Sequence, residues 1–328
     1  MTTLITGASG FVGSAVMRKC LARGEDVRVL VRENSDRTLI QEHAVEVVVG
    51  DLTDQASLEK AIEGCRYLYH VAADYRLWSK DPNELYQSNV DGTRNIMQAA
   101  LQQEIERIVY TSSVATLGLN ADGSPANEDT PVSLDDMVGD YKRSKYLAER
   151  EVDKLVTEQN LPAVIVNPST PVGAGDIKPT PTGQMILDAI TGQMPAYVDT
   201  GLNIVHVEDV ADGHLAAMDQ GIIGERYILG AADMTLQEIL TYIFNEIGQK
   251  PPKIKLPHNL ILPVAWVMER IAGITGKPPR VTVSGVQLAK KMMFFSHSKA
   301  SENLAYSPRP AGQALTDAVD WFQDFTES

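Results

Sequence analysis

The sequence opens with TTLITGASGFVG (residues 2–13), and this stretch decides the fold. Its first five residues form a predicted strand, Thr2–Thr6, which runs directly into a turn with glycines at positions 7, 10 and 13. An amphipathic helix and a second apolar strand follow within about thirty residues. A glycine turn lets the backbone approach a pyrophosphate, and the helix start supplies free N–H groups. An isolated glycine triplet is more often an ordinary turn, but this order of elements favours a dinucleotide site.

The alternation of strands and helices continues through the first half of the chain. Further strands are predicted at Val27–Val31, Val45–Val49, Tyr67–Val71, Arg107–Thr111 and Ala163–Asn167. Helices are predicted between them at Phe11–Arg23, Gln55–Glu63, Asn83–Gln103 and Tyr141–Gln159. Apolar strands separated by helices are typical of a parallel sheet covered on both faces. Right-handed crossovers make such a sheet doubly wound, so we expect an α/β fold of the Rossmann type.

Beyond Asn167 the sequence changes to a long segment rich in proline and glycine, followed by helices. We expect these helices at about Thr182–Thr191, Leu236–Ile247, Ile261–Ile274, Thr282–Met292 and Ala311–Phe325. The interpretation is a dinucleotide-binding domain over residues 1–170, to which 202–225 return. Residues 171–201 and 226–328 then form a smaller, mostly helical substrate-binding lobe. Long loops inside a compact domain are usually functional.

The glycine turn predicts cofactor contacts from Gly7, Gly10, Phe11, Val12 and Gly13. Strand Val27–Val31 ends without the acid that usually binds the ribose hydroxyls of NAD, and Arg32 follows. A guanidinium can pair with a 2′-phosphate, so NADP is favoured over NAD. The alternative is a surface arginine that caps a loop.

Three later segments are expected to follow the cofactor along the sheet. Asp51 and Leu52 come after the third strand, where the adenine would lie. Small residues end the fourth strand. Asn89, within the helix predicted after it, either touches the cofactor or fixes neighbouring backbone. The small residues are Val71, Ala72 and Ala73.

Tyr141 and Lys145 stand four residues apart, on one face of a predicted helix. A tyrosine near its usual pKa of about 10 is a poor acid or base at neutral pH. A neighbouring ammonium favours the phenolate, and acid–base catalysis works best when the pKa lies near the working pH. Ser113 ends the fifth strand, where side chains point into the ligand crevice, and can bind the substrate oxygen. Ser112 is the alternative.

Composition excludes several other classes of protein. The 328 residues carry a net charge of −14, which argues against binding nucleic acid or an anionic membrane through overall electrostatics. Cys20 and Cys65 form no disulfide or metal framework, and no metal site is expected. The most apolar run, Leu260–Met268, is about half the length of a membrane span. We expect a cytoplasmic protein without an integral membrane segment.

These motifs together resemble the extended short-chain dehydrogenase/reductases over nearly the whole chain. Val31-Arg32 and Asn167-Pro168 resemble the dihydroflavonol-4-reductase-like branch more than the nucleotide-sugar epimerases. Three stretches resemble the hopanoid-associated sugar epimerase family: residues 71–78, 167–173 and 194–201. The resemblance implies Ser113, Tyr141 and Lys145 as the catalytic set, with Pro168 and Ser169 beside the cofactor. A homodimer is common in similar enzymes.

Residues next to the inferred cofactor segments are candidates for substrate binding: Asp74, Tyr75, Trp78, Thr170 and Tyr197. The aromatic rings of Tyr75, Trp78 and Tyr197 suit a hydrophobic or lipid-linked small molecule better than a charged nucleotide. We therefore favour an NADP(H)-dependent oxidoreductase that reduces a carbonyl or oxidises an alcohol. Alternatives are an NAD(P)-dependent sugar epimerase associated with hopanoid lipids and, from another class, a non-catalytic dinucleotide-binding protein.

Overall fold

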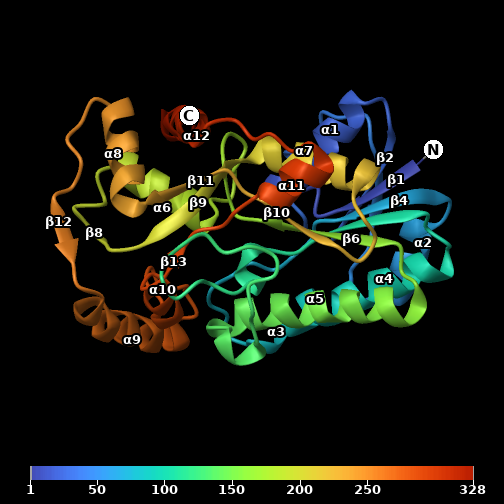
Figure 1. The fold of residues 1–328 in the computed structure, drawn as a ribbon, viewed down its shortest axis with the longest axis horizontal. Coiled ribbons are helices and arrows are strands. Elements are labelled where there is room, and N and C mark those ends of the chain that lie inside the picture. The colour runs from blue at the N-terminus through green and yellow to red at the C-terminus, as the bar shows by residue number, and fades with distance from the viewer. Residues whose placement is uncertain (1, 328) are drawn as a thin grey trace.

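The computed structural model describes residues 2–327 and shows a large parallel sheet beside a smaller lobe (Figure 1). The sheet has seven strands in the order β10-β6-β5-β4-β1-β2-β3, and every neighbouring pair is parallel. Its strands are β1 Thr2–Thr6, β2 Asp26–Val31, β3 Glu46–Val49, β4 Cys65–His70, β5 Arg107–Thr111, β6 Ala163–Pro168 and β10 Arg226–Leu229. The doubly wound Rossmann sheet predicted from the sequence is confirmed.

Helices cover both faces of this sheet because successive strand side chains point to opposite sides. Ile5 of β1 belongs to the apolar cluster that also contains side chains of α1 Phe11–Ala22, α7 Val207–Gln220 and α11 Ser298–Leu304. Its neighbour Leu4 faces α2 Gln55–Ile62, α4 Gly92–Gln102 and α5 Gly139–Gln159. The two apolar clusters form separate layers above and below the strands.

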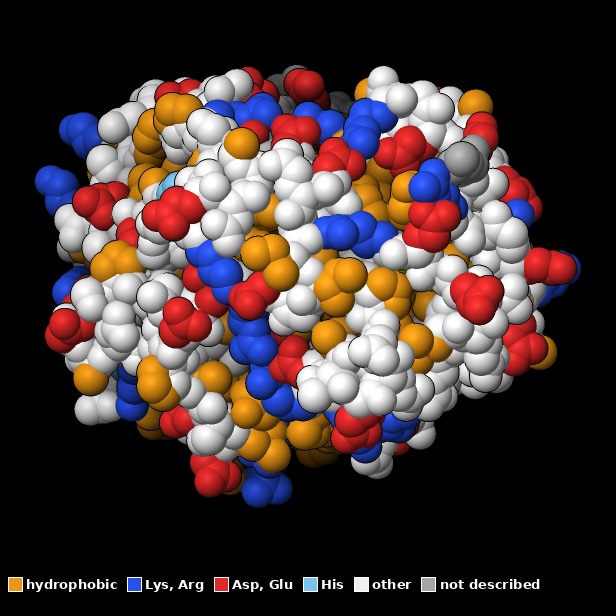
Figure 2. Space-filling view, turned by 45° about the vertical axis from the view of Figure 1, so that its right-hand side comes forward, with side chains coloured by type: hydrophobic (Ala, Val, Ile, Leu, Met, Phe, Trp, Pro, Cys, Tyr) orange, Lys and Arg blue, Asp and Glu red, His pale blue; other side chains and the backbone are white. Residues whose placement is uncertain are grey.

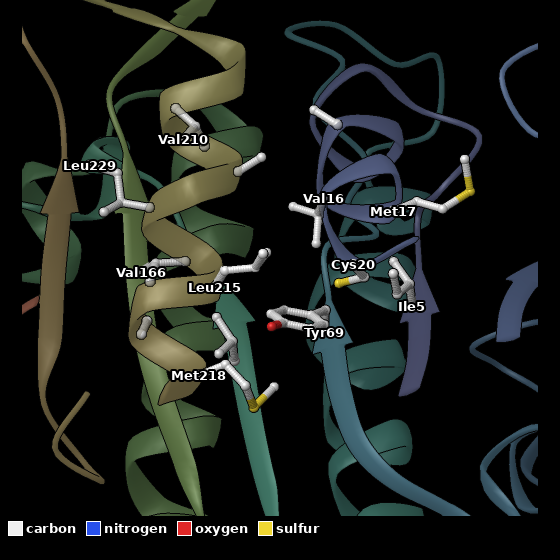
Figure 3. Close-up of a cluster of buried hydrophobic side chains, with 14 of the residues drawn as sticks. Ile5, Val16, Met17, Cys20, Tyr69, Val166, Val210, Leu215, Met218 and Leu229 are labelled. Carbon is white, nitrogen blue, oxygen red and sulfur yellow. The ribbon is translucent and has the colours of Figure 1, made fainter. Parts of the chain in front are cut away.

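The contact between α1 and α7 joins segments that lie far apart in the sequence. Figure 3 shows Cys20 of α1 and Leu215 of α7 on either side of Tyr69, above the strands. Three ion pairs follow the same contact along its length: Arg18–Glu208, Lys19–Asp212 and Arg23–Asp219. Burial raises the pKa of the Cys20 thiol, which is consistent with an inert core residue.

The smaller lobe packs five helices around short strands. The helices are α6 Pro181–Ile190, α8 Leu236–Glu246, α9 His258–Thr275, α10 Val283–Leu288 and α12 Ala311–Glu327. The strands are β7 Thr170–Val172, β8 Ala196–Val198, β9 Gly201–His206, β11 Ala232–Thr235, β12 Ile254–Leu256 and β13 Met292–Met293. β9 pairs with β7, β11 and β13, while β12 pairs with β8. The lobe therefore holds more strand than the sequence predicted.

The segment of the second half of the chain that joins the large sheet differs from the one predicted. Residues 202–225 were expected to return to this sheet, but β9 pairs with strands of the lobe, while α7 packs on the large sheet and Gly224 and Glu225 hydrogen-bond to β6. β10, placed in the lobe by the sequence, pairs in parallel with β6. The helix predicted at Asn83–Gln103 is interrupted as well. It consists of α3 Asn83–Tyr86, one π-helical turn at Gln87–Asp91 and then α4.

Candidate active site

The turn between β1 and α1 is built on close backbone approaches. Gly7 has a φ of +78°, and a Cβ there would lie 2.6 Å from the backbone nitrogen of Ala72. A Cβ on Gly13 would overlap the carbonyl of Gly7. The N–H groups of the first turn of α1, which include those of Phe11 and Val12, have no intrahelical acceptor, and Gly10 provides no side chain to cap them. This set of donors fits the pyrophosphate of a dinucleotide.

The strand beside the glycine turn is locked to it by hydrogen bonds. The hydroxyl of Thr6 contacts Nδ1 of His70 at 2.7 Å and accepts from the backbone N–H of Ala72 at 3.2 Å. Nε2 of His70 lies 3.1 Å from the hydroxyl of Thr93. Burial, with the charge of Lys145, lowers the pKa of His70 to about 3, so its ring is neutral. These bonds fix the backbone of residues 71–73, including Val71 and Ala73, beside the glycine turn. This is the segment along which we expect the cofactor to lie.

A pocket opens directly in front of the glycine turn. One wall comes from the turn itself, and the opposite wall comes from the loop that follows β7. The lining residues are Ser9, Gly10, Phe11, Asp36, Leu39, Tyr75, Gly175, Asp176, Ile177 and Lys178. Thr180 donates to the carboxylate of Asp176 through both its N–H and its hydroxyl, which fixes this loop. Lys178 is the basic side chain of this lining.

The other expected cofactor residues lie at the carboxyl ends of their strands. Arg32 is exposed after β2, and its backbone N–H donates to the Ser35 hydroxyl at 3.1 Å. The carboxylate of Asp51 accepts from the N–H and hydroxyl of Thr53, while the carbonyl of Leu52 accepts from Asn95. Pro168 ends β6 and is buried, and the N–H of Ser169 donates to the carbonyl of Leu229 at 3.1 Å.

Ser113, Tyr141 and Lys145 are brought together between β5 and α5. Ser113 lies just after β5, and its hydroxyl accepts from the N–H of Ala115 at 3.1 Å. Burial raises the pKa of Tyr141, while a side-chain hydrogen bond with Ser113 acts in the opposite direction. This contact distinguishes Ser113 from Ser112, the alternative that the sequence left open.

Lys145 lies one helical turn beyond Tyr141 and is 2% exposed. Its ammonium donates to the carbonyl of Thr111 at 3.0 Å and to the hydroxyl of Tyr110 at 3.3 Å. Burial lowers the pKa of Lys145 to about 8, against the opposing effect of the Glu149 carboxylate. The lysine can therefore change its charge near neutral pH, in reach of the crevice.

A buried polar cluster that the sequence did not reveal fixes the backbone of Ser113. Its carbonyl accepts from Asn167 at 3.0 Å and from the Thr116 hydroxyl at 2.8 Å. Asn167 also donates to the carboxylate of Glu149 at 3.0 Å, and the Thr116 hydroxyl, whose single proton serves one acceptor at a time, lies 2.8 Å from the same carboxylate. Burial alone raises the pKa of Glu149, but Arg226 and other partners bring it below its usual range. The available signal was a charged residue four positions after Lys145, on the same buried helix face.

The residues proposed for the substrate are not all gathered at one place. Tyr75 is exposed and lines the pocket, Trp78 is half-buried, and Thr170 begins β7. The carboxylate of Asp74 pairs with Arg76. Tyr197 differs from the expectation because it is buried in the lobe core among α6, α8 and α12, a packing position.

Asn89 lies in the π-helical turn and faces the substrate segment. Its amide nitrogen donates to the carbonyl of Asp74 at 2.9 Å and to the Ser144 hydroxyl at 3.0 Å, and its amide oxygen accepts from the N–H of Asp74 at 2.7 Å. Of the two roles considered for it, these contacts describe the fixing of neighbouring backbone. Single π turns inside helices often occur at functional sites.

Neither a cluster of metal-ligating side chains nor a membrane-spanning helix occurs in the part of the chain that the structure describes. Within residues 2–327, no three His, Cys, Asp or Glu side chains are grouped so that they could hold a metal ion. No helix in that range is both long enough and apolar enough to cross a membrane.

A parallel Rossmann sheet, a glycine turn that fits a pyrophosphate and a serine, tyrosine and lysine at the adjoining strand ends define a class of nucleotide-dependent enzyme. The model of the NAD dependent epimerase/dehydratase family matches residues 3–230. The chain belongs to this family, the extended short-chain dehydrogenase/reductases, and to its dihydroflavonol-4-reductase-like branch. It is an NAD(P)-dependent oxidoreductase or epimerase.

Relatives match the chain almost from end to end. It is 46% identical over 324 residues to a putative dihydroflavonol 4-reductase of Synechocystis sp., covering 98% of this chain and 94% of the relative. It is 36% identical over 326 residues to sterol demethylase protein B of Methylococcus capsulatus, covering 99% of both chains. The crystal structure of gox2253 superposes with a TM-score of 0.89 at 55% identity, covering 99% of this chain and 98% of that one.

Proposed function

We propose that the protein is an NADP(H)-dependent reductase that converts a carbonyl of a hydrophobic or lipid-linked small molecule into an alcohol, or catalyses the reverse oxidation. The observation that carries this proposal is the contact between Tyr141 and Ser113 at the carboxyl end of β5, beside the buried ammonium of Lys145. When bound, the nicotinamide supplies or accepts a hydride. The protein supplies the proton and the geometry.

Tyr141 is the proton donor for reduction in this proposal. Its phenol stays protonated at neutral pH because burial raises its pKa. As the carbonyl carbon is reduced, the developing alkoxide takes this proton while the hydroxyl of Ser113 donates a hydrogen bond to the same oxygen. The positive charge of Lys145 stabilises the phenolate that remains. In alcohol oxidation the same groups act in the opposite direction.

Arg32 supports NADP over NAD as the working cofactor, and Lys178 supports binding of either one. Arg32 is exposed at the end of β2, where a 2′-phosphate on the adenosine ribose would lie. Lys178 faces the glycine turn from the other wall of the pocket, a position suited to the pyrophosphate. The other residues expected to contact the cofactor would do so through small side chains or backbone groups. They are residues 51–52, 71–73 and 168–169.

The substrate class is inferred from the pocket and from the relatives. Tyr75 presents an aromatic surface next to the glycine turn, and Trp78 lies in the same segment. The names of the Synechocystis and Methylococcus relatives refer to a flavonoid and to a sterol, both of which are compact hydrophobic ring systems. The described pocket lining contains a single basic side chain. A nucleotide-sugar substrate would bring a second diphosphate, and one basic side chain is too few to bind it as well as the cofactor.

The family description favours one alternative function. An epimerase, here one associated with hopanoid lipids, would oxidise and re-reduce a single substrate with the same Ser113, Tyr141 and Lys145. A non-catalytic dinucleotide-binding protein, the third hypothesis, would need no such set. A homodimer remains part of the proposal by analogy with similar enzymes.

Cofactor exchange separates these functions experimentally. A reductase must release oxidised cofactor in each cycle, so dialysed protein should contain less than one nucleotide per chain. It should also consume NADPH in proportion to substrate, across a panel of hydrophobic aldehydes and ketones. Tightly bound cofactor at one per chain without NADPH consumption would support the epimerase. Binding of NADPH without turnover of any substrate in either assay would support the non-catalytic protein.

A further inference from the structure

Helix α9 carries a stripe of apolar side chains that faces solvent. Leu260, Val264, Val267, Ile271 and Ile274 recur at alternating spacings of four and three residues, so they share one face of the helix. Each of them is exposed, from 49% for Val267 to 86% for Ile274. Among the described side chains of α9, only Ala265 and Ala272 are buried. We call these five residues, together with Trp266 beside them, the α9 stripe.

The α9 stripe is concentrated in a way that chance exposure does not explain. Fourteen large apolar side chains of the described chain are exposed, and the α9 stripe with Ile254 of β12 provides half of them. Figure 1 shows α9 at the outer edge of the lobe, at lower left. Contiguous exposed apolar surface of this kind marks an interaction site more often than an accident of packing.

The charge around the stripe is opposite to that of the rest of the molecule. Residues 250–291 contain eight Lys and Arg side chains and a single acidic residue, which gives +7 in a chain whose net charge is −14. The basic residues lie on both sides of α9 and within it: Lys250, Lys253, Lys255, Arg270, Lys277, Arg280, Lys290 and Lys291. Figure 2 shows acidic and basic side chains interspersed over one face of the molecule.

The contacts of these charged groups leave most of the positive charge facing outward. The one acidic side chain, Glu269, is turned inward, where its carboxylate accepts from the N–H of Val283 at 2.8 Å. The guanidinium of Arg270 lies over the ring of Trp266, 4.9 Å from its centre. Lys255 pairs with Asp199 in an exposed ion pair, which salt and competing anions screen readily.

We propose that the α9 stripe and its basic flanks form a docking surface for an anionic lipid bilayer. An apolar helix face with a tryptophan, bordered by Lys and Arg, is the pattern of a helix that lies in the membrane interface. The overall charge of −14 argues against an anionic membrane as partner, but the segment that carries the stripe has the opposite sign. Charge also disfavours a second copy docked symmetrically, because such a dimer would bring two basic segments together.

The docking surface is connected to the start of the helix that carries Tyr141. α9 holds α10 through the Glu269–Val283 contact, and His258 holds its far end through the carbonyl of Ala289 at 2.9 Å. On its other side α10 touches Gly139, where an added Cβ would lie 3.1 Å from that of Ser284. Gly139 is two residues before Tyr141. The proposal does not depend on the reductase function, although a bilayer at this place suits a lipid-linked substrate.

Vesicle flotation tests the docking surface without any substrate. The full chain is mixed with phosphatidylcholine vesicles that contain or lack phosphatidylglycerol. It should float with the anionic vesicles only, and should be released at about 1 M salt, where charges are screened beyond about 3 Å. The fluorescence of Trp266 should shift to shorter wavelength on binding, and Trp266→Phe should remove most of that shift while the other two tryptophans remain.

Matched variants separate the stripe from general surface effects. Val264→Ser/Val267→Ser/Ile271→Ser changes only exposed positions and should abolish flotation with the fold intact. Ile222→Ser/Ile223→Ser, at two exposed isoleucines between α7 and β10, should float normally. Lys253→Gln/Lys277→Gln should weaken binding about fivefold per charge, whereas Lys80→Gln/Lys154→Gln should not.

Three results would overturn the proposal. One is wild-type protein that stays unbound on anionic vesicles, and another is a stripe variant that binds them as well as wild type does. The third is a dimer seen by analytical ultracentrifugation, without lipid, that the stripe variant dissolves. This third result would assign the α9 stripe to a second copy of the chain.

Discussion

Asn89 holds Asp74 by both of its backbone polar groups, accepting from the N–H at 2.7 Å and donating to the carbonyl at 2.9 Å. The Asn89 side chain thus satisfies both backbone hydrogen-bonding groups of Asp74, in a segment that belongs to no strand. Because Tyr75 and Trp78 follow in that segment, the wall of the pocket depends on a residue that does not line it.

Replacing Asn89 tests this dependence. Asn89→Ala removes both contacts to Asp74 and the one to Ser144, and should lower the free energy of unfolding by about 1–3 kcal/mol. KM for a carbonyl substrate should rise more than kcat falls, because the segment loses its position and the catalytic groups remain. Steady-state kinetics and chemical denaturation measure the two effects. Asn120→Ala, which removes hydrogen bonds in a remote turn, should leave KM unchanged. Equal KM values for the two variants would contradict the role given to Asn89.

Tyr141→Phe tests the proton donor. The ring is kept and only the hydroxyl is lost, so the rate should fall by about 10²–10⁴-fold while NADPH binding persists. Ser113→Ala should lower the rate less, since the proton itself still has a donor. Single-turnover kinetics and calorimetric titration with NADPH separate chemistry from binding. Near-normal turnover by Tyr141→Phe would show that another group provides the proton.

Arg32 and Lys178 should affect cofactor binding differently. Arg32→Ala should weaken NADPH by about 1.5–3 kcal/mol and leave NADH almost unchanged, because only NADPH carries the 2′-phosphate. Lys178→Gln should weaken both cofactors, since both contain the pyrophosphate that the glycine turn would bind. Calorimetry with each cofactor measures the two patterns. Wild-type protein that binds NADH more tightly than NADPH would remove the assignment of Arg32.

Lys145 and Lys142 are two buried lysines whose titration should make the free energy of unfolding depend on pH. Burial lowers the pKa of each from 10.5 to about 8, so between these values the unfolded chain binds more protons than the folded one. The free energy of unfolding should therefore rise with pH across this window, by about 1.4 kcal/mol for each pKa unit per lysine.

Replacing either lysine with methionine should remove part of that rise, as denaturation at pH 7, 8, 9 and about 10 would show. Only Lys145→Met should also impair turnover and cofactor affinity, because Lys142 is the matched buried lysine outside the proposed catalytic set. A pH dependence that survives both substitutions would mean that other groups titrate in this window.

Features formed by residues close together in the sequence were predicted well, and features formed by distant residues were not. The β1 strand, the glycine turn and α1 lie within one stretch, and periodicity with turn chemistry predicted them almost to the residue. The π turn around Asn89 was missed because it is one extra residue in an otherwise helical pattern. The strands of the lobe are two to six residues long and exist only through partners far along the chain.

The site followed the same division. Tyr141 and Lys145 could be proposed from the sequence because their spacing carries the chemistry. Glu149 could not, because it contacts Asn167 and Thr116, which only the folded chain brings near it. Tyr197 was expected at the substrate because its neighbours in sequence suggested it. The structure instead buries its ring in the lobe core, among side chains of α6, α8 and α12.

The packing of α7 on α1 has a consequence for how the chain is made. The two helices are separated by about 185 residues, so when a ribosome has released α1, its apolar face and Cys20 have no cover. At about 5–20 residues per second, α7 emerges roughly 10–40 seconds later. For that interval the face of the nascent sheet that carries α1 lacks its cover of α7, so its completion depends on the timing of translation as well as on its own stability.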